Sequence, residues 1–191
     1  MTKKDGIIVT RKLTMFPSPD YPALDTSMPI IIYYGKKRKV LDVPVYGTAR
    51  VRERECSKYV RMAASDLFGK SYSIANAWDR RYKDKLVYEV DDSFLESLAK
   101  QGTLLPGMIV GIRNPDSTHN QDLDILGEQA RYTHNALYLG NNRFGRPLFA
   151  EQFINAINVR TEEDMRKSHL IPVEIIDVKS PSLNTFFFKI V

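Results

Sequence analysis

Apolar residues recur at three- and four-residue steps directly after the only cysteine of the chain. This spacing places them on one side of a helix of 3.6 residues per turn, and the glycine at position 69 is a residue type that commonly ends a helix. The pattern predicts an amphipathic helix with Cys56 in its early turns. The positions that carry it are Cys56, Tyr59, Val60, Ala63 and Leu67.

Acidic and β-branched segments outside this helix predict the rest of the fold. "DDSFLESLAKQG" (91–102) is typical of a second helix, with Asp91 or Asp92 near its start and Gly102 past its end. Short, β-branched stretches bounded by glycine are typical of strands. They are "PIIIYYG" and "VLDVPVYG" before the first helix, and "LLPGMIVGI", "YTHNALYLG", "PLFAEQFI", "IPVEII" and "FFFKIV" after the second. A helical half followed by a run of strands predicts an α+β fold with N-terminal helices packed on an antiparallel β-sheet.

The N-terminal region has a different composition from the rest. Four prolines within thirteen positions predict an extended arm over residues 1 to about 30, because proline favours extended backbone in its predecessor. We therefore divide the chain into an arm with two strands (1–45) and a domain with the helices and remaining strands (46–191). The basic run "GKKRKV" (35–40) between those strands is interpreted as a solvated hairpin turn rather than a phosphate-binding or nuclear-targeting patch.

Composition narrows the classes of protein that the chain can belong to. With 191 residues, 43% hydrophobic and 27% charged, it has the balance of a globular domain. The net charge of +5 favours anionic partners only weakly and indicates no specific nucleic acid. No stretch approaches the ~20 apolar residues of a transmembrane helix, and no secretory signal is visible. The localisation and the oligomeric state stay open.

One cysteine and three scattered histidines limit the chemistry. A disulfide within the chain is excluded, and the spacing of a zinc site is absent, so we expect no metal and no cofactor. A thiol near a helix N-terminus can have its pKa lowered from ~8.5 to between ~3.5 and ~7.5 when a cation assists, which makes it a nucleophile. The alternative is that Cys56 is a small buried hydrophobe.

A nucleophilic thiol needs a base, and His134 is the candidate. His119 lies in a polar loop and His169 in a turn, which favours exposed side chains for both. His134 begins a predicted strand that leads into a hairpin, and such an imidazole needs an acceptor to orient it.

The hairpin supplies that acceptor. A register centred between Asn142 and Arg143 puts Glu151 opposite His134, on the same face of the sheet. A slip of one residue would offer Gln152 instead, and the two-residue period of a strand allows only one of them to serve. We favour Glu151 and keep Gln152 as the alternative.

The order of these motifs resembles a known group of enzymes. The cysteine at a helix start is followed by "NAW", "LLPGMIVG", "THNALYLG" and "FAEQF". This order over about residues 46–155 resembles the CHAP amidases and the related NlpC-type cell-wall peptidases of the papain-like cysteine peptidases. Cys56, His134 and Glu151 stand at the positions of the family's Cys, His and Glu. The sequence departs at Glu55, Met108 and Phe153, where such enzymes commonly carry Asp, Asp and Asn.

The resemblance implies a papain-like thiol amidase or peptidase that acts on the peptide moiety of peptidoglycan. It also implies an oxyanion donor upstream of the cysteine, for which Tyr46 is our candidate beside the Cys56 backbone N–H; the alternative for Tyr46 is a core aromatic. Trp78 is interpreted as a core residue rather than a stacking platform. Two other functions stay open. They are a noncatalytic papain-like binding or phage structural module, and a thiol hydrolase or acyltransferase acting on a protein or lipid.

Overall fold

The computed structural model describes residues 25–34, 36–47, 50–52, 55–72, 85–90, 95–117, 133–153 and 156–178, with residues 85–89 described by their backbone alone. Its helices are α1 (Cys56–Phe68), α2 (Leu95–Lys100) and α3 (Glu162–Lys167). Its strands are β1 (Thr26–Tyr34), β2 (Lys37–Val45), β3 (Lys85–Glu89), β4 (Ile109–Arg113), β5 (His134–Asn141), β6 (Pro147–Phe153), β7 (Ala156–Thr161) and β8 (Ile171–Val178).

The strands of the described ranges form one antiparallel sheet. Their order is β2-β1-β5-β4-β8-β3, with β6 paired to β5 and β7 paired to β6. Strand β5 is the junction, because it pairs with β4, with β6 and, at Asn141, with Tyr33 of β1. The α+β prediction with an antiparallel sheet is therefore confirmed.

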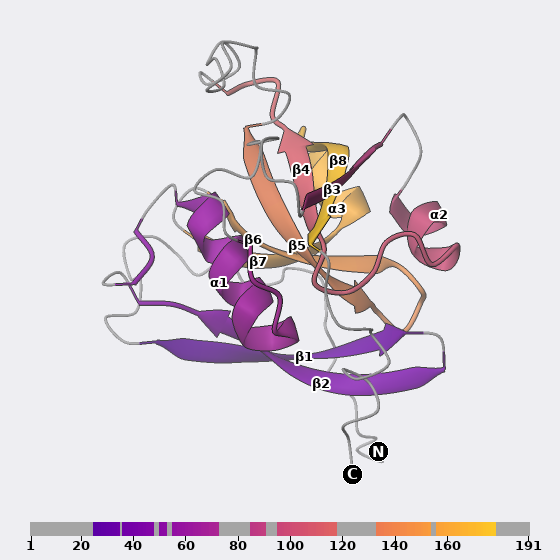
Figure 1. The fold of residues 1–191 in the computed structure, drawn as a ribbon, viewed down its shortest axis with the longest axis horizontal. Coiled ribbons are helices and arrows are strands. Elements are labelled where there is room, and N and C mark those ends of the chain that lie inside the picture. Colours follow the sequence, from indigo (N-terminus) through magenta and orange to yellow (C-terminus); the bar gives the residue numbers. More distant parts are fainter. Residues whose placement is uncertain are drawn as a thin grey trace, which may run out of the picture.

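Each face of the sheet carries its own hydrophobic cluster. Alternate residues of β5 and β6 supply the two clusters, since successive side chains of a strand point to opposite faces. One cluster joins Leu137 and Ala150 to β1, β2 and the buried side of α1. The other joins Ala136 and Phe149 to α2, β4 and Met165 of α3. Helix α1 packs against the β1–β2 hairpin at an angle to its strands (Figure 1), so these two strands share a core with the helix that begins at the cysteine.

Helix α1 matches its prediction closely. It begins at Cys56, and its fully buried side chains include Tyr59, Val60 and Ala63. It ends at Gly69, whose φ of 64° lies in the left-handed region that glycine adopts without strain. The next residue, Lys70, forms a buried ion pair of 2.5 Å with Asp177 of β8, which ties the end of the helix to the far part of the sheet.

Other elements differ from the prediction. Strands β3 and β7 and helix α3 were not predicted, and β1 begins at Thr26, inside the segment that we expected to be an arm. The basic run does lie at a hairpin, where Tyr34 pairs with Lys37, but most of it continues as the start of β2. The predicted strand "FFFKIV" and most of the proline-rich arm lie outside the described residues.

The predicted register of the β5–β6 hairpin is wrong by two residues. Leu137 pairs with Ala150, where the prediction places Leu148. The turn is longer than predicted because the Asn142 side chain accepts hydrogen bonds from the N–H groups of Phe144 and Arg146, and Gly145 adopts a φ of 79°. Asn141 pairs with Pro147, so the longer turn displaces the pairing at this position by three residues from the predicted register.

A β-bulge then restores the phase of the two strands. The register shifts by one residue between Tyr138 and Gly140 of β5, which leaves a net displacement of two. Because strand side chains alternate with a period of two, an even displacement keeps His134 and Glu151 on the same face. Glu151 is thus a diagonal neighbour of His134 rather than the residue directly opposite.

Candidate functional site

The N-terminus of α1 is fixed to the sheet by two amides. Asn135 donates its side-chain N–H to Ser57 Oγ at 2.8 Å, and Gln152 donates its side-chain N–H to the carbonyl of Arg52 at 2.8 Å. Each amide immediately follows a residue of the predicted trio, so it points to the opposite face of its strand. The same strands therefore hold the helix that carries Cys56 and present the groups that face it.

His134 lies between the thiol and a carboxylate. Its side chain is buried, and its Nε2 lies 2.6 Å from Oε2 of Glu151. It also hydrogen-bonds the Cys56 side chain. Because Nε2 engages Glu151, Nδ1 is the ring nitrogen that is left to face the sulfur. Phe153 packs edge-on against the ring, with centroids 5.4 Å apart, and limits its rotation.

The charges of the thiol and the imidazole stabilise one another. Burial raises the pKa of Cys56, but the hydrogen bond and charge of His134, together with the Asn135 backbone N–H, bring the pKa of the thiol below its usual value. Burial likewise opposes a charged His134, yet Cys56 and Glu151 outweigh it and raise the pKa of His134 to about 10. Both shifts favour a thiolate–imidazolium pair over a neutral thiol and imidazole.

Arg160 completes the charge arrangement and was not predicted from the sequence. Its Nε lies 2.6 Å from Oε1 of Glu151, so the two oxygens of this fully buried carboxylate face two cations. Arg160 belongs to β7, which was not predicted as a strand. A basic residue within the alternating "AINVRT" is the signal that could have placed it beside Glu151.

Tyr46 is not brought to the thiol. Its hydroxyl donates to Asp66 at 2.8 Å, and its ring packs edge-on against Tyr59 in the core. Asp66 lies ten residues after Cys56, which is about 15 Å along the helix axis at 1.5 Å per residue. The proposed oxyanion donor is therefore a core aromatic, because burial and the bond to Asp66 commit its hydroxyl elsewhere.

The structure distinguishes between the two candidates for the third residue and also places His169. Gln152 faces the loop before α1 and not the imidazole, so Glu151 is the residue that contacts His134. His169 lies in an exposed turn beside Asp116, as expected. His119 and Trp78 lie outside the described residues.

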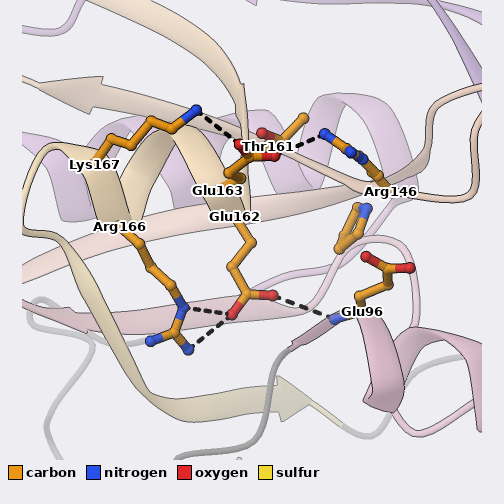
Figure 2. Close-up of a pocket in the computed structure, with 8 residues that line it drawn as sticks. Glu96, Arg146, Thr161, Glu162, Glu163, Arg166 and Lys167 are labelled. Atoms are coloured by element: carbon orange, nitrogen blue, oxygen red, sulfur yellow. Dashed lines mark hydrogen bonds and ion pairs between the residues drawn. The ribbon is translucent and has the colours of Figure 1, made fainter.

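A cavity of about 530 Å³ is lined by residues of α2, β6, β7 and α3 (Figure 2). Its charged side chains pair with one another: Glu163 with Arg146 and Lys167, and Glu162 with Arg166. None of Cys56, His134 or Glu151 lines it.

In the ranges that the structure describes, no cluster of histidine, cysteine and acidic side chains is placed to hold a metal ion. Over the same ranges, every helix is too short or too polar to span a membrane.

No family model, no curated protein and no solved structure matches this chain significantly.

The structural role of Tyr46 is testable by Tyr46→Phe. Loss of the hydrogen bond to Asp66 should lower the free energy of unfolding by about 1 kcal/mol, measured by urea denaturation. The alkylation rate of Cys56 should stay at its wild-type value, because the hydroxyl is remote from the thiol. A slower alkylation at unchanged stability would return Tyr46 to the site.

The ion pair predicts the pH dependence of the thiol. At pH 7 iodoacetamide should label native Cys56 on the order of tenfold faster than the urea-unfolded chain, in which most of the thiol is protonated. The rate should fall only when the pH drops through the lowered pKa of the thiol, since protonation then removes the thiolate. A native rate equal to or below the unfolded rate would favour the small-hydrophobe interpretation.

Proposed function

We propose that this protein hydrolyses amide bonds by a cysteine mechanism in which Cys56 is the nucleophile, His134 the acid and base, and Glu151 the carboxylate that orients the imidazole. The observation that carries the proposal is the position of His134, which contacts the thiol on one side and a buried carboxylate at 2.6 Å on the other. This is the arrangement that nucleophilic catalysis by a thiol requires.

The proposed reaction begins from the thiolate–imidazolium pair. The Cys56 sulfur attacks the carbonyl carbon of the amide, and the imidazolium of His134 gives its Nδ1 proton to the leaving amine as the C–N bond breaks. The acyl group is then held as a thioester and His134 is neutral. Water attacks the thioester while His134 accepts its proton, which releases the acid and restores the pair.

Backbone donors at the start of α1 suit the developing oxyanion. The first N–H groups of a helix have no acceptor within the helix, and the N-terminal end of the helix dipole favours negative charge. Cys56 is the first residue of the thirteen-residue α1, so its own N–H lies beside the attacking sulfur. We assign this N–H as one oxyanion donor in place of Tyr46.

The substrate class comes from the resemblance in motif order to CHAP and NlpC-type enzymes. We propose the peptide moiety of peptidoglycan as the substrate and a papain-like architecture for the domain. The α1 helix packed on an antiparallel sheet, with His134 at the start of a strand, supports this assignment.

The test is incubation with purified peptidoglycan and mass analysis of the released fragments. The wild type should release peptide fragments with a new carboxyl and a new amine terminus, and Cys56→Ala should release none. Glu151→Ala should lower turnover on the order of a hundredfold, because the imidazole loses its orientation and its counter-charge. Glu151→Gln should retain more activity than Ala, because the amide oxygen still accepts the ring N–H.

Glu163→Ala is the matched control, since this exposed carboxylate pairs only with surface cations and should leave turnover unchanged. Equal fragment release by the wild type and Cys56→Ala would refute the thiol mechanism. Binding of peptidoglycan by the wild type without any cleavage would instead favour the noncatalytic module.

A further inference from the structure

Three contacts fix the Arg160 side chain against the rear of the proposed site. Its Nε pairs with Glu151 at 2.6 Å, its Nη1 donates to Ser168 Oγ at 3.1 Å, and its guanidinium lies over the Phe153 ring at 5.1 Å. The side chain is 16% exposed, which is low for an arginine. A surface ion pair does not need three fixed contacts, so this geometry indicates a defined role for the guanidinium.

The carboxylate that Arg160 contacts has no access to solvent. Glu151 is 0% exposed, and an ionised carboxylate at such a depth is strongly destabilised unless opposite charges and hydrogen bonds compensate. Its register partner on β7 is the uncharged Asn158, and its other ionic contact is His134 of β5. Cys56 of α1 lies on the far side of the imidazole, and the buried Glu162 of α3 pairs with Arg166 of its own helix.

The charge on His134 changes during the proposed reaction. In the resting state the imidazolium and Arg160 together balance the thiolate and Glu151. Once the imidazolium has given its proton to the leaving amine, both the sulfur and the ring are neutral, and Glu151 keeps Arg160 as its counter-charge. With Arg160 present the buried group is electrically balanced before and after acylation.

We propose that Arg160 is a positioning residue that holds the Glu151 carboxylate in place, oriented toward Nε2 of His134, throughout the reaction. The proposal rests on the proposed function above. Without the guanidinium, the Glu151 carboxylate is no longer held toward Nε2, the imidazolium loses this counter-charge, and its Nδ1 proton returns to the Cys56 sulfur, which leaves a neutral thiol and a neutral imidazole. Arg160 forms no ion pair with the thiol, so its electrostatic effect on Cys56 passes through Glu151 and His134.

The test measures the pH profile of Cys56 alkylation by iodoacetamide in Arg160→Met, and it needs no substrate. The midpoint of the profile should move up toward that of an ordinary thiol, with labelling at pH 7 slowed on the order of tenfold. Arg160→Lys keeps the charge, so the midpoint of its profile should lie closer to that of the wild type. Arg160→Gln removes the charge but keeps a polar donor, and it serves as the readout if the methionine variant does not fold. Arg146→Met removes an exposed arginine that pairs with Glu163 and is the matched control.

The double variant Arg160→Met/Glu151→Gln decides whether Arg160 acts through Glu151. Its profile should match that of Glu151→Gln alone, because residues that act as one unit are not additive. The proposal would be overturned if folded Arg160→Met or Arg160→Gln kept the wild-type pH profile of alkylation. It would also be overturned if the midpoint shifts of the two single variants added up in the double variant. A shifted profile in a protein that does not cleave peptidoglycan would support the role of Arg160 and refute only the proposed substrate.

Discussion

A carboxylate that is shut off from solvent sets the constraint on which the site depends. Glu151 is fully buried and must be matched by positive charge, and His134 and Arg160 provide that charge on its two oxygens. The imidazolium that Glu151 stabilises in turn stabilises the thiolate of Cys56. The pKa of the thiol at the start of α1 is therefore lowered by charged side chains of the sheet, and the position of the cysteine at the helix start does not account for this shift alone.

The alternation of side chains along β5 and β6 explains how one pair of strands can do this. His134 and Glu151 point to one face, while their neighbours Asn135 and Gln152 point to the other and hold the N-terminus of α1. The helix and the base are thus positioned by adjacent residues of the same strands. A change of one residue in register would exchange these two roles, so the bulge between Tyr138 and Gly140 is part of the site.

The sequence predicts the elements with strong periodicity and misses those that depend on tertiary pairing. Helix α1 could be predicted because its apolar spacing and Gly69 agree. The contact between His134 and Glu151 was predicted from a register that is wrong by two residues. The two side chains still share a face of the sheet, because side chains alternate along a strand with a period of two. The length of the hairpin turn depends on side-chain hydrogen bonds of Asn142 that no propensity scale contains.

Tyr46 and Arg160 show the other limit of sequence patterns. A tyrosine ten positions before the cysteine suits an oxyanion donor by spacing alone, but the packing of β2 against α1 turns its hydroxyl toward Asp66. Arg160 comes from a strand with only six residues, and its partner is nine positions earlier in the chain. Both assignments depend on which faces meet, and that is a property of the assembled sheet.

The protonation state of His134 tests the central claim most directly. In protein labelled with ¹⁵N histidine, with His134 assigned by its loss in His134→Gln, both ring nitrogens should carry a proton at pH 8 and titrate at a pH of about 10. Cys56→Ala should lower that midpoint, because the thiolate then no longer stabilises the imidazolium. A wild-type midpoint near the ordinary value of about 6.5, or one that Cys56→Ala leaves unchanged, would contradict the ion pair and the mechanism built on it.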